Sequence, residues 1–337
     1  MSKNSGMKVV HYSDYLQLER ILDSQQPESG LVGKPAHDEM LFIIIHQAYE
    51  LWFKQIMYEV ESVNGIMQQP SLNDNSPELQ TVVHRLQRVV TILKVLVQQI
   101  DIMETMTPMD FLDFRDMLRP ASGFQSWQFK ALEARLGLQF QHRHGQEYYI
   151  SQLRQEQIDL IKKVESERPL ISLLNSWLER MPFLDIEAQW WDNYTNIYTE
   201  SLSDNEKANL EGFHRVFDNI EQTERQLSAR AGRAALFIML YRGYPILQLP
   251  FQLLNVLLEI DEQLSTWRYR HMNMVHRMIG TRVGTGGSTG KEYLKGAVDK
   301  HYIFREIAQL TSFLVERRKL PALSQNMERR LGFDAGA

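Results

Sequence analysis

The sequence predicts an all-α protein, and three observations support that prediction. Apolar residues recur at every third or fourth position along most of the chain, which is the spacing of one helix face. Only 11 prolines and 18 glycines occur among the 337 residues, and the glycines cluster only between positions 284 and 290. No alternating strand of convincing length and no repeat of about 20 to 50 residues is found. We therefore expect a multi-helix bundle of roughly ten or more helices that forms a single domain over residues 1–337.

Two long helices are expected in the first third of the chain. The first follows Pro35, and its apolar face also contains a histidine; the face consists of Phe42, His46, Tyr49, Phe53 and Ile56. The second begins at Ser76-Pro77, because serine caps a helix N-terminus and proline fits the first helical position. Its apolar stripe consists of Leu79, Val82, Leu86, Val89, Leu93, Leu96 and Ile100.

Two further helix starts follow the same logic. Thr107-Pro108 opens a helix that Pro120 stops, because proline cannot continue the hydrogen-bond ladder. Ser126 is expected to cap the helix after it.

The second half of the chain is expected to contain a polar helix and a long amphipathic one. The polar helix runs from Ser203 or Asp204 to about Ser228, and the long helix runs from near Pro250 to about Ile279. Residues 139–145 read as a mobile polar connection, and residues 140–150 and 181–205 give the weakest helix signals.

Composition excludes several classes of function. The formal net charge is −5, so the sequence offers no electrostatic case for nucleic-acid binding. There is no cysteine, which excludes disulfides, iron–sulfur clusters, thiolate-ligated haem and cysteine nucleophiles. No apolar stretch is long enough to span a membrane, and the first ten residues lack the apolar core of a signal peptide. We therefore expect a cytoplasmic protein.

Two histidines lie on apolar helix faces. His46 belongs to the face described above, and His271 shares its face with Ile260, Leu264, Trp267, Met274 and Met278. A histidine in such a place is either a core residue bonded to a neighbouring carbonyl or a ligand of a metal or haem. The residues alone leave both interpretations open. His142 and His144 lie in a polar segment and are expected to face solvent.

Arg115 is the third candidate. Phe111 lies one turn before it and Leu118 one turn after it, so its surroundings are apolar. A buried guanidinium needs an anion, because an unpaired buried charge is costly. That anion is either an acidic side chain of the protein or the carboxylate of a substrate, which the planar guanidinium fits well.

The glycine cluster GTGGSTG, residues 284–290, directly follows the helix with His271. Its glycines allow the backbone to approach a ligand closely, and its hydroxyls can form hydrogen bonds. It is not a phosphate loop of the Walker type, because Thr285 and Glu292 stand where that motif needs Gly and Ser or Thr. It is either a ligand-contacting loop or a surface loop.

Longer motifs are more specific than any of these residues alone. They are HDEMLFIIIHQAYELWFK at 37–54, DFR at 113–115 with PASGFQS at 120–126, and WRYRH at 267–271 with MVHRMIG at 274–280 and GTGGS at 284–288. In this order, and over nearly the whole chain, they resemble the signatures of the tryptophan 2,3-dioxygenase family. The region from about 140 to 230 resembles the family only loosely.

The resemblance implies an all-α haem protein that uses O2 to cleave the C2–C3 bond of the L-tryptophan indole, yielding N-formyl-L-kynurenine. His271 would be the axial ligand of the iron of haem b. His46 would be the catalytic histidine on the oxygen side, bonded to the indole N–H. Ser122 and Gly123 would lie beside the haem and the bound oxygen.

The same resemblance implies the substrate contacts. Arg115 would bind the carboxylate of L-tryptophan, and Thr285 would form a hydrogen bond with its amino-acid end. Phe42 and Phe111 would pack against the indole.

The resemblance also implies a homotetramer that is a dimer of dimers. The N-terminal segment, residues 1–34, would contact a neighbouring subunit. Tyr12, Tyr15 and Leu16 would reach into the substrate site of that subunit. Neither a nucleic acid nor a membrane is expected as a partner.

Three other functions stay open. The closest is a related haem monooxygenase that forms a 2-oxindole from tryptophan or a substituted tryptophan. The others are a haem-binding sensor or carrier without turnover, and a helical scaffold without haem. The presence of both Arg115 and Thr285 favours the dioxygenase over a protein that has lost turnover.

Overall fold

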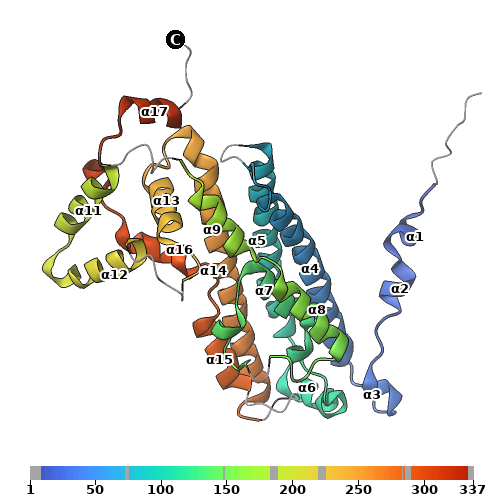
Figure 1. The fold of residues 1–337 in the computed structure, drawn as a ribbon. Helices are drawn as coiled ribbons and strands as arrows, with labels where there is room; N and C mark the ends of the chain where they lie inside the picture. The colour runs from blue at the N-terminus through green and yellow to red at the C-terminus, as the bar shows by residue number, and fades with distance from the viewer. Residues whose placement is uncertain are drawn as a thin grey trace, which may run out of the picture.

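The computed structural model describes residues 9–72, 76–146, 149–182, 189–218, 225–282, 284 and 290–332. Every regular element among them is helical, which confirms the all-α prediction (Figure 1). The α-helices are α1 (Tyr12–Leu16), α2 (Leu18–Leu22), α3 (Glu28–Leu31), α4 (Asp38–Met67), α5 (Pro77–Met103), α6 (Pro108–Arg115), α7 (Trp127–Leu136), α8 (Gln155–Ser166), α9 (Leu170–Glu179), α11 (Trp190–Ser201), α12 (Ala208–Phe217), α13 (Ala229–Leu240), α14 (Pro245–Ile279), α15 (Gly290–Lys300), α16 (Arg305–Gln309) and α17 (Gln325–Leu331). Short 3₁₀ helices are η1 (Asp116–Leu118), η2 (Gly123–Gln125), η3 (Phe140–His142), η5 (Asp204–Glu206), η6 (Leu310–Phe313) and η7 (Arg317–Lys319).

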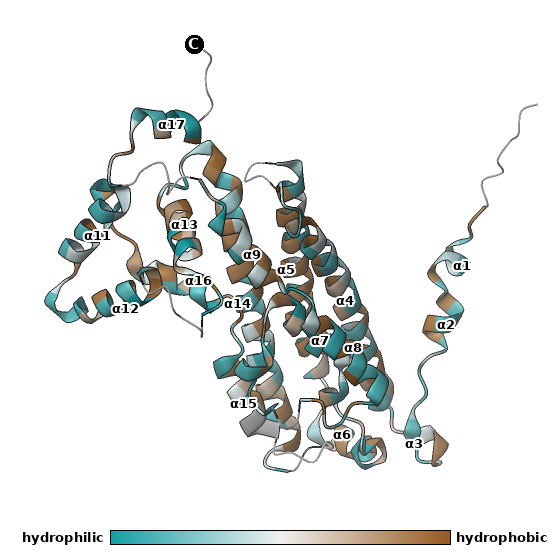
Figure 2. Ribbon diagram, in the orientation of Figure 1, coloured by the Kyte–Doolittle hydropathy of each residue, from teal (hydrophilic) through white to brown (hydrophobic). Residues whose placement is uncertain are grey.

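Three long helices form the centre of the molecule. α5 packs against both α4 and α14, and Figure 1 shows the three side by side. α7 packs on α4, α8 packs on α7, and α15 packs on α14. Hydrophobic residues concentrate where the long helices face one another (Figure 2). The predicted stripe of α5 is fully buried from Leu79 to Ile100, as its helical spacing requires.

The predicted N-caps are confirmed. The Ser76 hydroxyl accepts the N–H of Leu79 at 3.2 Å, with Pro77 at the first position of α5. Thr107 and Asp110 exchange hydrogen bonds in a capping box at the start of α6. Ser126 caps α7 in the same manner. These local bonds satisfy N–H groups that the first helical turn leaves without partners, so the boundaries follow from the sequence.

The predicted polar helix to about Ser228 is wrong. The helix α12 ends at Phe217, and Ser228 instead caps α13. The backbone N–H groups of Gln226 and Leu227 donate to the carboxylate of Glu306 at 2.7 and 3.1 Å. A distant acidic side chain therefore holds the backbone just before α13, and residues 219–224, between α12 and this point, lie outside the described part of the chain.

Two other boundaries differ from the prediction. α14 begins at Pro245, so Pro250 lies inside the helix, where it removes a single hydrogen-bond donor. Residues 139–145 form a connection that is only partly in solvent, because positions 139–141 are exposed whereas Arg143 is 6% exposed and pairs with Glu133. His142 and His144 are half-buried rather than exposed, since the same turn packs on the bundle.

The N-terminal segment lies apart from the bundle. α1 and α2 contribute no buried residue, and Figure 1 shows them beside the bundle rather than in it. The segment is attached to α4 by hydrogen bonds; the backbone N–H groups of Glu28 and Ser29 donate to the buried carboxylate of Glu39 at 2.8 and 3.0 Å. Across the described residues, each helix is too short or too polar to cross a membrane.

Candidate active site

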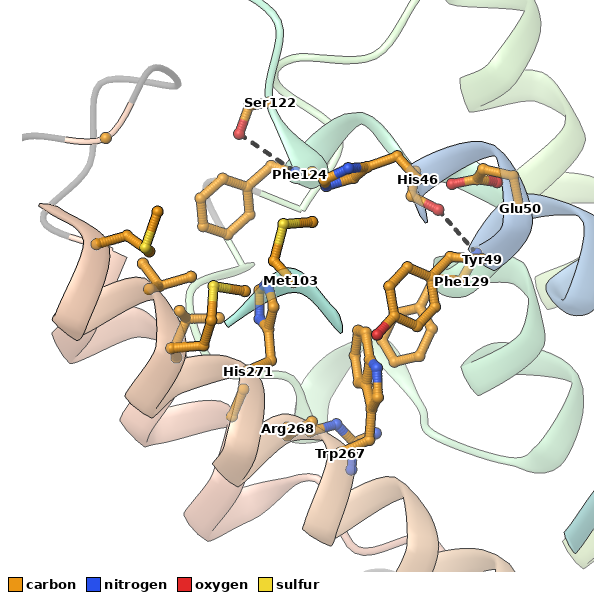
Figure 3. Close-up of a pocket in the computed structure, with 18 of the residues that line it drawn as sticks. His46, Tyr49, Glu50, Met103, Ser122, Phe124, Phe129, Trp267, Arg268 and His271 are labelled. Atoms are coloured by element: carbon orange, nitrogen blue, oxygen red, sulfur yellow. Dashed lines mark hydrogen bonds between the residues drawn. The ribbon is translucent and has the colours of Figure 1, made fainter. Parts of the chain in front are cut away.

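A cavity of about 310 Å³ lies among α4, α5, α6, α7, α14 and α15. Several residues singled out in the sequence line it, although they are up to 229 positions apart; they are Phe42, His46, Phe111, Arg115, Ser122, Gly123 and His271. Gly284, at the start of the glycine cluster, lines it as well. Figure 3 shows the imidazoles of His46, from α4, and His271, from α14, pointing into the same space.

His46 is a neutral imidazole with one free nitrogen. Its Nδ1 donates to the carbonyl of Phe42 one turn earlier, at 2.7 Å, which leaves Nε2 as an acceptor on the cavity side. Burial lowers the pKa of His46 below its usual value, although the Phe42 carbonyl and the Glu50 carboxylate act in the opposite direction. His46 can therefore accept a hydrogen bond from a ligand N–H at neutral pH.

His271 is also held neutral. Burial, with a smaller contribution from the neighbouring His46, lowers the pKa of His271 to about 4. The indole of Trp267, one turn earlier on α14, stacks on the His271 ring with a centroid distance of 5.3 Å and an interplanar angle of 3°. Trp267 is itself fixed edge-to-face against Tyr49 and Phe53 of α4. The imidazole is thus oriented by packing and remains unprotonated, which is the form that binds metals.

Arg115 lies beside a pair of aromatic rings. It is 4% exposed and ends α6, with Phe111 one turn before it. The ring of Phe111 stacks on that of Phe42 at 5.7 Å, and Phe42 in turn lies 4.2 Å from the His46 ring. An apolar slot, a guanidinium and an imidazole acceptor therefore lie side by side.

The segment between α6 and α7 closes one wall of the cavity. The hydroxyl of Ser122 accepts the backbone N–H of Phe124, which starts the short helix η2 and directs the Phe124 ring into the cavity (Figure 3). The other walls are mainly apolar; they include Met103, Phe129, Trp267, Met274 and Met278.

A charged group at this cavity was missed in the sequence. It consists of Lys130, Glu133, Arg143, Arg268 and His301, all of which line the same cavity. The spacing of Lys130 and Glu133 on α7 was a visible signal, because residues three apart share a helix face. Nothing in the sequence indicated that Arg143 and His301 would join them.

Four predicted site residues are not placed at this cavity. Thr285 lies outside the described residues. Tyr12 and Tyr15 are 71% and 75% exposed on α1, and Leu16 lies beside them on the same short helix. None of these three is among the residues that line the cavity of its own chain.

Fold and site together define a class of protein. A helical bundle encloses an apolar cavity that presents two neutral imidazoles and a buried guanidinium, which is an arrangement for a large, mainly apolar ligand with an anionic group.

Comparisons with known proteins give the family. The family profile described as Tryptophan 2,3-dioxygenase matches residues 2–219 and 209–314. The chain is 43% identical to a tryptophan 2,3-dioxygenase of Bdellovibrio bacteriovorus, with 96% of this chain and 98% of the relative covered. It is 42% identical to one of Alteromonas mediterranea (99% of each chain) and 40% identical to one of Dictyostelium discoideum (98% and 90%). The chain belongs to the tryptophan 2,3-dioxygenase family.

Proposed function

We propose that this chain is a haem-dependent dioxygenase that opens the indole ring of L-tryptophan at C2–C3 with O2 and forms N-formyl-L-kynurenine. The observation that carries the proposal is a single cavity that holds two neutral imidazoles, His46 and His271, with the buried Arg115 in its wall. The relatives named tryptophan 2,3-dioxygenases, which match over nearly the full length, support it.

The residues present fit haem b. A histidine kept neutral by burial is a suitable axial donor, and the cavity around it is lined mainly by apolar and sulfur-containing side chains. His271 would hold the iron, with Ser122 and Gly123 beside the ring. When bound, the haem supplies the activation of O2, which no amino-acid side chain can perform.

The chain's own residues bind and orient the substrate. Arg115 receives the carboxylate in a two-pronged contact, and the stacked Phe42 and Phe111 rings form the slot for the indole. The Nε2 of His46 accepts the hydrogen bond of the indole N–H, because Nδ1 is already used by Phe42. Thr285 is assigned to the amino-acid end by the family resemblance. Residues 1–34 of a neighbouring subunit would cover this cavity and keep bulk water from the reacting atoms.

We further propose that residues 1–337 form one catalytic domain and assemble as a homotetramer, a dimer of dimers. The exposed Tyr12 and Tyr15, with Leu16, belong to a segment that contributes nothing to its own core. Residues 1–34 would cover the substrate site of a neighbour. A chain that lacks residues 1–34 should bind haem but show a raised KM for tryptophan.

A single turnover with labelled oxygen tests the reaction. The haem-loaded protein is reduced without air, mixed with L-tryptophan and exposed to ¹⁸O₂. The mass of the product is then measured by mass spectrometry. Two labelled atoms in a ring-opened product are expected. One labelled atom in an oxindole would show a monooxygenase instead, and a haem-loaded protein that gives no product would contradict turnover altogether. His271→Ala, studied in parallel, should lose the absorbance of histidine-ligated haem.

A further inference from the structure

The charged end of the cavity contains more positive charge than the protein neutralises. Glu133 of α7 accepts hydrogen bonds from Arg143 at 2.5 Å and from Arg268 at 2.6 Å. Burial raises the pKa of Glu133, but the two guanidinium groups lower it by more, so the carboxylate stays ionised. One carboxylate is therefore shared by two buried guanidinium groups.

His301 does not change this balance. Its Nε2 accepts the backbone N–H of His144 at 3.0 Å, so that nitrogen carries no proton. Its Nδ1 lies 3.5 Å from the Glu133 carboxylate and is the position of the ring proton. The imidazole is thus neutral.

Lys130 adds a third positive charge. Its side chain lines the cavity and is 7% exposed, and its ammonium lies 5.5 Å from the centre of the Tyr149 ring. Within the described part of the chain, no hydrogen bond or ion pair reaches that ammonium. The lysine carbonyl, by contrast, accepts from Arg143, which fixes the backbone beneath it. Burial lowers the pKa of Lys130 to about 8, so the ammonium is still the main form at neutral pH.

These observations indicate a binding site for an anion inside the cavity. Three cations face two carboxylates, Glu133 and, beside Arg268, Asp261, so one positive charge remains uncompensated in this group, and buried charges in proteins are normally paired. Arg143 and Arg268 are held in place by Glu133, whereas Lys130 is the group that remains available to a ligand.

We propose that Lys130, with Arg143 and Arg268 behind it, binds a carboxylate of the tetrapyrrole that occupies the cavity. The inference rests on the proposed haem-dependent function. Haem b carries two propionate carboxylates on an otherwise apolar ring, which matches a cavity with one charged end. Lys130 is therefore a cofactor-positioning residue that contributes to how long haem stays bound.

Haem dissociation tests the proposal independently of activity. Protein reconstituted with haem b, or with its dimethyl ester, is mixed with excess apomyoglobin, and the rate of haem transfer is followed by absorbance. From wild-type protein the ester should leave about 10- to 100-fold faster than haem b, the range expected for a charge-assisted hydrogen bond. Lys130→Met should release haem b faster by a similar factor but leave the ester rate unchanged, and Lys130→Arg should restore slow release of haem b.

Lys162→Met is the matched control, because Lys162 is exposed on α8 and should leave both rates unchanged. If Lys130→Met accelerates the release of haem b and of its dimethyl ester equally, and also lowers the melting temperature of the apo-protein, Lys130 has a structural role and the proposal is overturned.

Two further outcomes distinguish an error in the role of Lys130 from an error in the proposed haem dependence. Unchanged release rates, with a KM that rises for L-tryptophan but not for tryptamine, would mean that Lys130 binds the substrate carboxylate instead. If wild-type protein retains neither porphyrin, the proposed haem dependence itself fails, and this inference fails with it.

Discussion

Replacing Arg115 with methionine should remove the contact with the substrate carboxylate. Arg115 is 4% exposed, so its guanidinium meets the carboxylate away from bulk water. Removing one partner of a buried, hydrogen-bonded charge pair costs about 3 to 5 kcal/mol. Because each ~1.4 kcal/mol is a factor of ten, kcat/KM for L-tryptophan should fall about 100- to 4,000-fold. Methionine retains the apolar stem that packs near Phe111.

The assay compares L-tryptophan with tryptamine, which has the same indole but no carboxylate. Wild-type enzyme should prefer tryptophan by about the factor that the substitution removes, and Arg115→Met should turn over the two substrates almost equally. Arg119→Met is the control, because the Arg119 side chain is 51% exposed and pairs with Asp116 on the surface. It should retain the wild-type preference.

Equal losses for tryptophan and tryptamine would refute the reasoning, since a contact with the carboxylate cannot affect a substrate that lacks one. So would an unchanged KM and kcat for tryptophan. In the first case Arg115 would support the shape of the cavity, and in the second the carboxylate would be bound by other residues.

Three further predictions concern buried titratable groups. Glu133→Gln leaves two buried guanidinium groups without their carboxylate, so the free energy of unfolding, measured with urea, should fall by about 3 to 5 kcal/mol. The control is Glu61→Gln, at an ion pair whose carboxylate side chain is 49% exposed, where the free energy of unfolding should fall by less than about 1 kcal/mol. Burial raises the pKa of Asp261 from 3.8 to about 6 in the folded chain, so the folded state binds a proton more tightly than the unfolded state does. The melting temperature of the wild-type protein should therefore rise relative to that of Asp261→Asn as pH falls from 7 to 5. A parallel pH dependence of the two melting temperatures would contradict this. Because burial lowers the pKa of His46 below 6.5, kcat/KM should stay level as pH falls through 6.5 and decline only at lower pH, whereas a midpoint at 6.5 would show an unperturbed imidazole.

Helix starts were predictable because their causes are local. A serine or threonine at an N-cap and a proline at the first position act within one turn, as at Ser76 and Thr107. The backbone path into α13 was not predictable, because Glu306, about 80 positions away in the chain, accepts the N–H groups of Gln226 and Leu227. A tertiary hydrogen bond of this kind leaves no local pattern.

The candidate site divides in the same way. Phe42 and His46, or Phe111 and Arg115, are one turn apart on a single helix, so their periodicity already joins them. The convergence of α4, α6 and α14 on one cavity followed only from the family resemblance, not from spacing. Of the charged end, only the spacing of Lys130 and Glu133 left a signal in the sequence. Arg143 lies in a turn that appeared polar and exposed, and His301 is 157 positions from its partner.

The two ends of the cavity impose different requirements on one ligand. The end with the neutral imidazoles is walled mainly by apolar side chains, so it favours an uncharged ring and disfavours a water-filled space. The charged end is costly while empty, because the buried ammonium of Lys130 has no hydrogen-bond or ion-pair partner among the described residues. Any ligand that supplies both a large apolar ring and a carboxylate removes both penalties at once.

The binding of such a ligand is linked to folding. A ligand that binds only the folded chain raises the free energy of unfolding, and the increase grows with the logarithm of the ratio of ligand concentration to Kd. Haem b should therefore raise the melting temperature of this chain far more than either L-tryptophan or an uncharged porphyrin does, and Lys130→Met should reduce that rise.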